Sequence, residues 1–493
     1  MGVAAGGSVR VKRPASEGRY EGGLRMERGW KVLATTSIGS LMVFLDTSIL
    51  NVAFRSMVKD FGPGSQQQLT WVFSAYSIAF AAALLTAGRA ADRIGRKRMF
   101  LIGVVVFAVG SGLCGISPNV GLLIASRVVQ ALGGALIVPS ALALILPEFP
   151  PERRSVAIGI SGAIGGLSAA FGPAIGGVLV EAFGWRSVFT INLPLSVLAI
   201  VVGSRILRES KDATAVAMPD PLGGILAIAG VGLLTAAVVE GDNWGWFSLR
   251  VVGAVVLSIA VLVLFVVRSS RHPIPVIDLS LFKLRFFSAA NLSSLLFSMG
   301  FFGMFFVNVQ FLQSVYGYSP IRSGLASSPG PVMAAIFAGP AGNWAQRRGH
   351  KQIIVPGLAL FSLGMMLLAL TVTPTTSYWT SFFPAYAITG LGVGLTISTL
   401  GSASNAFLPP NRFGMGSAIG ATGRQFGAAL GIAGVSAIRT GASDADVMVG
   451  FRRAWVFVIV TSVLAGIAMY AFFRKPSEAE IAASRMLPAP SPA

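Results

Sequence analysis

The chain has 493 residues, of which 54% are hydrophobic and 12% are charged, and its formal net charge is +19. Soluble domains carry about 25% charged residues, so this composition excludes an ordinary soluble protein and predicts a chain that crosses a membrane many times. The two histidines and single cysteine exclude a His-rich metal cluster and an internal disulfide. The sequence also contains no Gly-rich phosphate-binding loop, and we expect neither an enzyme nor a bound cofactor.

Apolar segments of about 20 residues, enough to cross roughly 30 Å of hydrocarbon as a helix, recur along most of the chain. The predicted fold is an all-α polytopic membrane protein with fourteen spans, which begin near Trp30, Leu69, Met99, Asn119, Ser155, Ser187, Leu222, Leu249, Phe286, Ile321, Gln352, Tyr378, Gly414 and Arg453. Its expected divisions are a flexible basic tail at 1–29, a six-helix half at 30–208, two inserted helices with their linkers at 209–284, a second six-helix half at 285–474 and a tail at 475–493.

Most Lys and Arg residues lie in the loops that share a side with the two ends of the chain. Examples are the basic residues before the first span and the run from Arg93 to Arg98, while the opposite loops carry few positive charges. Positive residues are retained in the cytoplasm, so we expect both termini to be cytoplasmic. This distribution accounts for the net charge without a nucleic-acid partner, and the Ala-, Gly- and Arg-rich usage suggests a bacterial cytoplasmic membrane.

The first span contains a carboxylate, Asp46, within the sequence Leu45-Asp46-Thr47-Ser48. An ionised Asp at the centre of a bilayer costs about 2.5 kcal/mol or more. Such a group therefore usually faces a water-filled cavity, pairs with a cation or holds a proton. The alternative is a buried polar residue that only fixes helix packing.

A dense block of charge lies between the second and third spans, from Gly88 to Arg98. It resembles the corresponding loop of the major facilitator superfamily, a large class of secondary transporters. The resemblance implies a charged latch that binds the other half of the protein and stabilises one conformation, and the latch residues here are Gly88, Asp92, Arg93, Gly95 and Arg96. Charge that only sets topology is the alternative, and it would explain the Arg and Lys but not the Asp and Gly.

The fourth span contains Arg127 and Gln130, in a stretch that resembles the superfamily's Arg-x-x-Gln motif, although Ala131 replaces the usual first Gly. Counting residues from the span ends places Arg127 about 12 Å below one boundary and Asp46 about 22 Å above the other, which is a similar depth in a core of roughly 30 Å. We therefore expect Asp46 and Arg127 to act together in proton coupling. Arg127 would lower the proton affinity of Asp46 when close and restore it when the helices move apart.

The fifth span is rich in small residues and contains Gly172, Pro173, Gly176 and Gly177. Small residues let helices approach and slide past one another, and Pro weakens a helix locally. The segment resembles the superfamily motif associated with antiporters rather than symporters. Generic packing by small residues is the alternative.

The charged block recurs 254 residues later (342 minus 88), from Gly342 to Lys351. The stretch around Arg127 likewise matches one around Tyr386, at an offset of 259 (386 minus 127). The chain is therefore predicted to be an internal duplication of six-helix halves. Gln346 and His350 replace an acid and an Arg in the second block, so its latch should be weaker.

Twelve spans fill the two halves, and the two that begin near Leu222 and Leu249 are inserted between them. Together with the motif around Asp46, this arrangement resembles the fourteen-helix drug/proton antiporter branch, whose members export quaternary ammonium compounds, dyes, antibiotics and other amphipathic molecules. The resemblance implies a monomeric exporter of amphipathic drugs that is driven by the proton gradient and works by alternating access. A facilitator or proton symporter for a small metabolite is the main alternative, and a non-transporting receptor on the same fold is another.

Polar residues within the spans are the candidates for the substrate cavity, and they are Asn51, Gln130, Asn308, Gln310, Gln313 and Arg424. Arg424 lies about 15 Å inside the thirteenth span, where it needs an anionic substrate group, a gate contact or backbone carbonyls as a partner. Since Asp46 is the only acid expected deep in the membrane, we expect neutral, zwitterionic or anionic amphiphiles to be favoured over dications.

Overall fold

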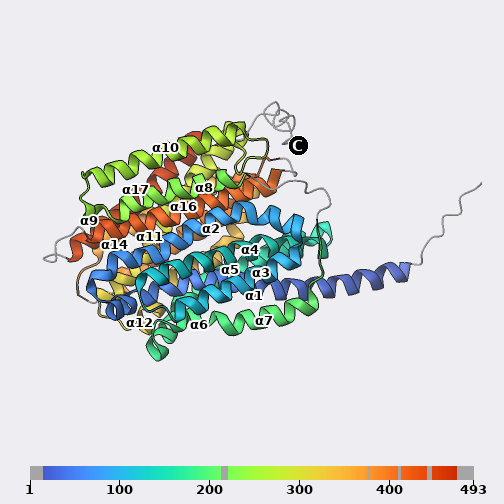
Figure 1. Ribbon diagram of the computed structural model, residues 1–493, viewed down its shortest axis with the longest axis horizontal. Coiled ribbons are helices and arrows are strands. Elements are labelled where there is room, and N and C mark those ends of the chain that lie inside the picture. The colour runs from blue at the N-terminus through green and yellow to red at the C-terminus, as the bar shows by residue number, and fades with distance from the viewer. Residues whose placement is uncertain (1–14, 212–219, 376–377, 409–411, 441–446, 475–493) are drawn as a thin grey trace, which may run out of the picture.

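The computed structural model describes residues 15–211, 220–375, 378–408, 412–440 and 447–474, and its helices lie side by side along the long axis of one bundle (Figure 1). The side chains of some residues inside these helices, Asp92 among them, also lie outside the description. No strand occurs within the described ranges. The expected all-α architecture is therefore confirmed for this part of the chain.

The first half contains α1 (Ala15–Phe61), α2 (Gln66–Ile94), α3 (Arg96–Gly115), α4 (Val120–Ile145), α5 (Pro151–Phe183), the short α6 (Ser187–Thr190) and α7 (Asn192–Ile206). Next come α8 (Pro221–Val239), the short α9 (Gly241–Trp244) and α10 (Leu249–Arg271). The second half contains α11 (Arg285–Ser314), α12 (Pro320–Ala326), α13 (Pro329–Arg348), α14 (His350–Thr371), a π-helical turn at Tyr378–Phe382, α15 (Phe383–Asn405), α16 (Phe413–Thr440) and α17 (Val447–Phe472). Helix α1 thus starts inside the segment expected to be a tail.

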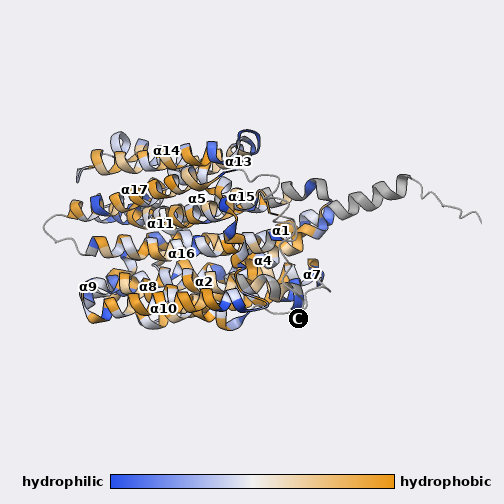
Figure 2. Ribbon diagram, turned by 90° about the horizontal axis from the view of Figure 1, so that it is seen from above, coloured by the Kyte–Doolittle hydropathy of each residue, from blue (hydrophilic) through white to orange (hydrophobic). Residues whose placement is uncertain are grey.

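Ten helical segments of the described chain are long and apolar enough to cross a membrane. They are Glu27–Phe61, Arg96–Gly115, Val120–Glu148, Ser187–Ile206, Pro221–Val239, Leu249–Arg271, Arg285–Ser314, His350–Thr371, Tyr378–Asn405 and Val447–Phe472. Helix α10 illustrates their surroundings, since its Leu257, Ile259, Val263 and Leu264 are all more than 50% exposed and hydrophobic colour runs along it in Figure 2. An apolar face of this extent is suited to lipid rather than to water.

The internal duplication is visible in matching backbone features of the two halves. Gly95, between α2 and α3, and Gly349, between α13 and α14, have φ angles of 131° and 99°, and they are 254 positions apart (349 minus 95). A Cβ added at Gly133 of α4 or at Gly392 of α15 would lie 2.3 or 2.4 Å from a backbone nitrogen of the preceding helix. These two glycines are separated by the second offset of 259 (392 minus 133), so the same close helix contact occurs once in each half.

The inserted helices α8 and α10 pack against each other, and α8 also packs on α2 and α16. Arg268 of α10 donates to both carboxylate oxygens of Asp220, at 2.6 and 2.8 Å, and Asp220 caps the first turn of α8. The hydrogen bonds from Arg268 hold the pKa of Asp220 below its ordinary range. Beyond the other end of α8, Trp71 of α2 donates to Glu240 at 3.2 Å, which ties the inserted pair to the first half.

We call the end of the bundle where α1 begins and α17 ends the terminal end, and the opposite end the far end (Figure 1). Hydrogen bonds between described residues of the two halves lie from the middle of the bundle to the far end. There the Thr70 and Ser436 hydroxyls are 2.8 Å apart, and Glu181 of α5 accepts from the backbone amide of Ile321 at 3.1 Å. The bond closest to the terminal end joins α16 to the carbonyl of Ala81, in the middle of α2.

The exposure of the α1 side chains also differs between the two ends of the bundle. Lys31, Ala34 and Phe44 are exposed, whereas every residue from Ser48 to Phe54 is buried. At 3.6 residues per turn the three exposed side chains spread over roughly 140° of the helix circumference. The halves are thus in contact toward the far end, while α1 has exposed side chains toward the terminal end.

Glycines bring the halves into backbone contact at the far end. A Cβ added at Gly324 of α12 would lie 2.1 Å from the carbonyl oxygen of Pro173 in α5, and one added at Gly177 would lie 2.5 Å from the carbonyl oxygen of Pro320. Because the obstructing atoms belong to the backbone, a side chain at either position requires α5 and α12 to separate.

We expect Gly324→Ala to weaken closure of the far end. Spin labels at the exposed positions Gln68 and Thr375, one in each half, should show a new population at longer distance in pulsed electron paramagnetic resonance. Gly339→Ala is the matched control, because its added Cβ would meet no atom within 4 Å. Identical distance distributions in Gly324→Ala and in the control would contradict this account of the interface.

Candidate functional site

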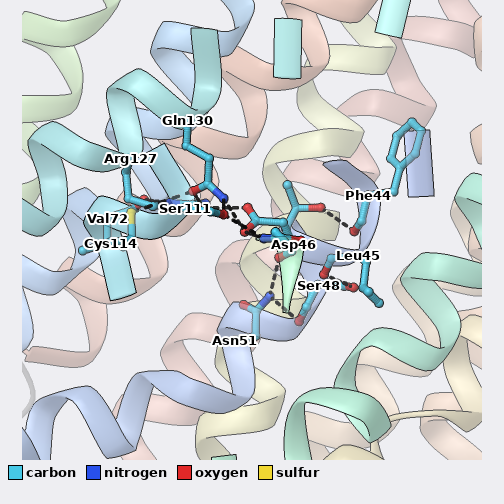
Figure 3. Close-up of polar contacts among 12 residues, drawn as sticks. Phe44, Leu45, Asp46, Ser48, Asn51, Val72, Ser111, Cys114, Arg127 and Gln130 are labelled. Atoms are coloured by element: carbon cyan, nitrogen blue, oxygen red, sulfur yellow. Dashed lines mark hydrogen bonds and ion pairs between the residues drawn. The ribbon is translucent and has the colours of Figure 1, made fainter. Parts of the chain in front are cut away.

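Asp46 of α1 lies in the middle of the first half, where two other helices, α4 and α7, place donors around its carboxylate (Figure 3). Oδ2 accepts from Nη1 of Arg127 on α4 at 2.6 Å, and Oδ1 accepts from Nε2 of Gln130 on α4 at 2.8 Å and from Nδ2 of Asn192 on α7 at 3.2 Å. The residue is 2% exposed. An ionised carboxylate only accepts hydrogen bonds, and every contact of Asp46 fits that form.

Arg127 is 1% exposed and uses most of its donors within the first half. In addition to Asp46, its Nη1 reaches Oε1 of Gln130 at 2.6 Å, and its Nε donates to the carbonyl of Val72 on α2 at 3.2 Å. The guanidinium carbon lies 4.1 Å from the centroid of the Tyr76 ring, a distance at which the face of an aromatic ring attracts a cation. Arg127 therefore keeps partners on α2 that do not depend on Asp46.

Sequence reasoning missed two members of this network, Ser111 and Asn192. Ser111 Oγ lies 2.6 Å from Nε2 of Gln130 and 2.9 Å from Nδ2 of Asn192. The contact exists because α3 and α4 nearly touch, since a Cβ added at Gly110 would lie 2.5 Å from the backbone nitrogen of Gln130. The signal that could have found Asn192 is an amide inside an otherwise apolar span.

Asn51, expected to line the cavity, is buried and bonds to its own helix. Its Nδ2 donates to the carbonyl of Thr47 at 3.2 Å and to that of Ser48 at 3.4 Å (Figure 3). Structurally it therefore belongs to α1 packing in this conformation.

The three polar candidates on α11 are buried and lie toward the far end. Asn308 accepts from the indole nitrogen of Trp455 at 2.9 Å. Gln313 donates to the carbonyl of Val52 on α1 at 3.0 Å and to the Ser323 hydroxyl at 3.0 Å, so it bridges the two halves. Nε2 of Gln310 has no hydrogen-bond partner among the described residues.

Arg424 lies on α16, apart from the Asp46 network. A Cβ added at Gly420 would lie 3.5 Å from Nη1 of Arg424, 3.3 Å from Oδ1 of Asn291 on α11 and 3.7 Å from Oγ of Ser404 on α15. The guanidinium therefore points to the place where α11, α15 and α16 meet.

The charged block after α2 contains a tight turn with a backbone conformation that favours glycine. Gly95 has a φ of 131°, a value that L side chains rarely adopt. Sequence reasoning missed Glu209, just beyond α7, whose carboxylate accepts from the backbone amides of Lys97 and Arg98, at 3.1 Å each. A carboxylate at this position stabilises the start of α3.

The other expected latch residues occupy different surroundings. Arg93 is exposed, Arg96 Nη1 donates to the carbonyl of Ala143 at 3.4 Å, and a Cβ at Gly88 would lie 3.9 Å from Pro139. The side chain of Asp92 lies outside the described residues.

The glycines of the antiporter motif lie at two helix contacts. A Cβ added at Gly172 would lie 1.8 Å from Oγ of Ser48, and one added at Gly176 would lie 3.0 Å from the carbonyl oxygen of Ile49. Gly172 and Gly176 thus let α5 approach α1 beside Asp46, while Pro173 and Gly177 of the same segment meet α12.

The described residues contain no group of three or more His, Cys, Asp or Glu side chains that could hold a metal ion. Around Asp46 the structure brings together one carboxylate, one guanidinium, two amides and one hydroxyl.

Several curated proteins are similar to this chain over most of its length. Multidrug resistance protein Stp of Mycobacterium tuberculosis is 33% identical over 402 residues, which cover 81% of this chain and 74% of that protein. The tetracenomycin C resistance and export protein of Streptomyces glaucescens is 33% identical over 408 residues, covering 82% and 75%. The methylenomycin A resistance protein of Streptomyces coelicolor is 31% identical over 481 residues, covering 96% and 97%.

The fold is also found in solved structures. The crystal structure of a D-xylose-proton symporter matches with a TM-score of 0.67 at 13% identity, covering 90% of this chain and 98% of that one. A family profile described as Major Facilitator Superfamily matches residues 36–432 and 292–491. The membership that the charged block suggested is thereby confirmed, and the chain belongs to the Major Facilitator Superfamily.

Proposed function

We propose that this chain is a proton-coupled exporter of amphipathic drugs or related small molecules in a bacterial cytoplasmic membrane. Relatives that cover most of the chain are named as multidrug or antibiotic resistance proteins, and one is named as an export protein. The observation that carries the proposal is the buried Asp46, whose only ionic partner among the described residues is Arg127, at 2.6 Å. Neither group belongs in a membrane interior without a function that uses charge.

The proposed topology has fourteen spans in two six-helix halves, with two inserted helices, and both termini in the cytoplasm. Each expected span start lies inside a helix or turn, or one residue before it. Beyond the ten apolar segments, the other four are α2, α5, α12 with α13, and α16, which meet at the boundary between the halves. The terminal end is then cytoplasmic, and the observed conformation is closed toward the outside.

Protonation of Asp46 requires the network around it to rearrange. Its Oδ2 faces Nη1 of Arg127, and its Oδ1 faces the amides of Gln130 and Asn192. A protonated carboxyl carries an O–H donor, which would point at another donor in this arrangement. Proton binding therefore requires Arg127 to withdraw or an amide to turn. An amide can turn in place, whereas withdrawal of Arg127 separates α4 from α1, and we infer that this second change is the one that links protonation to helix movement.

This rearrangement is the proposed link between proton binding and the change in conformation. With Asp46 ionised and paired, the far end is closed and substrate enters from the cytoplasm. Once the halves rock outward, water reaches Asp46, a proton binds, and substrate leaves. Arg127 keeps the Val72 carbonyl and the Tyr76 ring as partners, so it is not stranded when the ion pair opens.

Gly88, Asp92, Arg93, Gly95 and Arg96 remain the proposed latch for the outward conformation. The bonds from Lys97 and Arg98 to Glu209 support this, because they fix the turn that presents the block. Gly172, Pro173, Gly176 and Gly177 are proposed to act as the sliding surface between the halves, and their close backbone contacts support that role.

Asp46→Asn should abolish proton coupling while leaving the protein in the membrane, since the amide keeps the shape but cannot hold a transferable proton. In energised inside-out vesicles that contain the unmodified protein, amphipathic drugs should collapse the pH gradient. With Asp46→Asn, the drug-dependent proton movement should fall to the background of empty vesicles. Thr36→Val is the control, because Thr36 is buried on the same helix and bonds only to its own turn. Coupling by Asp46→Asn at the control rate would disprove the assignment.

Arg127→Gln should insert normally yet lose coupling, because it removes the cation that Asp46 faces. If the two residues act as a unit, Arg127→Gln should fall to the same background as Asp46→Asn. The measurement is substrate-driven proton movement, normalised to the amount of protein in the membrane, with Thr36→Val as the control. Proton movement by Arg127→Gln above that background would mean that Asp46 couples without Arg127.

A further inference from the structure

The second half of the chain is almost free of acidic residues. Between Arg285 and Arg474 the sequence contains only Asp444 and Asp446, which lie outside the described residues and follow the far end of α16. Asp46 is already bound to Arg127 at 2.6 Å in the first half. The protein therefore offers Arg424 no carboxylate at its own depth within its half.

Arg424 has no hydrogen bond or ion pair to any described residue. Two positions before it, Thr422 donates to the carbonyl of Ala81 on α2. Its guanidinium lies level with Gly420, seven positions from the start of α16 (420 minus 413), which is about 10 Å along the helix. This lean toward the helix start is normal for a helical side chain. It places the charge on the side of the bundle that is open toward the terminal end.

The surroundings of Arg424 are polar and incompletely bonded. Asn291 is 8% exposed, its Nδ2 donates to the carbonyl of Phe287 at 2.8 Å, and its Oδ1 has no partner among the described residues. On α15, Ser404 places its Oγ 3.7 Å from the Cβ that could be added at Gly420, and this hydroxyl donates to the carbonyl of Gly401 on its own helix at 3.0 Å. The groups that surround the guanidinium are therefore an amide oxygen without a partner and a hydroxyl, neither of which is a charged counter-ion.

We propose that Arg424 is the anion subsite of the export path and binds a carboxylate, or an equivalent anionic group, of an amphipathic substrate. The guanidinium can hold such a group through paired hydrogen bonds, and Oδ1 of Asn291 can accept from a neighbouring substrate hydroxyl. The inference rests on the proposed export function and makes it more specific. It assigns the proton to Asp46 in the first half and the substrate anion to Arg424 in the second.

The same chemistry could come from a lipid phosphate, so binding is measured in nanodiscs of phosphatidylcholine, which carries no net charge. The probes are naphthalene, anthracene and pyrene, each as the carboxylate, the methyl ester and the aminomethyl derivative. Their binding is measured by the quenching of the protein's tryptophan fluorescence. For at least one framework the unmodified protein should bind the carboxylate about tenfold or more tightly than the ester, as for a charge-assisted bond. Arg424→Gln should remove this preference, and Arg424→Lys should keep part of it.

Arg439→Gln is the matched control, because Arg439 lies on the same helix, contacts the Phe451 ring at 5.7 Å and forms no ion pair with a described residue. Its acid preference should equal that of the unmodified protein. Three results would overturn the subsite. They are no preference for the carboxylate in any of the three frameworks, the same preference in Arg424→Gln as in the unmodified protein, and an equal loss of the preference in Arg439→Gln. Competition by phosphatidylglycerol for the probe would identify lipid phosphate as the occupant and also overturn it.

The same compounds, tested for proton movement in vesicles, separate this inference from the export function. Proton movement driven by esters or amines without an acid preference would reject the subsite and leave the export function standing. If no compound moves protons, the export function is rejected first, whatever binds at Arg424.

Discussion

The structure depends on one constraint, which is that a charge inside the membrane must have a partner. Asp46 meets it with a cation and two amides from α4 and α7, and Arg127 meets it with a carboxylate, a carbonyl and an aromatic face. Removing one partner from such a buried pair typically costs about 3–5 kcal/mol. Opening the pair therefore requires a substitute for each group. Arg127 has the Val72 carbonyl and the Tyr76 ring, and in the proposed mechanism a proton takes the place of Arg127 at Asp46.

The two halves share repeated backbone features but differ in the charges they carry. At the position of Arg127 the second half has Tyr386, which is 1% exposed and whose ring would lie 2.9 Å from a Cβ added at Gly330. The close helix contacts at Gly133 and Gly392 occur in both halves, while the pair of Asp46 and Arg127 occurs in the first. The fold therefore does not require a charge at this position, and its presence in the first half points to a function. Arg424 is the reverse case, a charge in the second half that has no hydrogen-bond or ion-pair partner among the described residues.

Much of the fold could be predicted from the sequence, because apolar length, charged loops and repeats are properties of the chain itself. The depth count that put Asp46 and Arg127 at one level used only the helical rise, and the two side chains do lie in contact. Ser111 and Asn192 escaped this reasoning, because their contact depends on how α3 and α7 rotate about their axes. The same limit placed Asn51 in a cavity, whereas its amide bonds to its own helix. Glu209 was missed since it lies more than 100 positions from the amides that it caps.

The most direct test of the central claim is proton release on substrate binding. Purified protein in a weakly buffered solution with a pH indicator is mixed with an exported drug at a series of pH values. If proton and substrate compete through Asp46, protons should appear on binding, by reciprocal linkage, with the yield rising toward about one per protein as the pH falls. None should appear from an Asp46→Asn variant that still binds the drug. Equal release from both proteins, or no release from the unmodified one, would contradict the account.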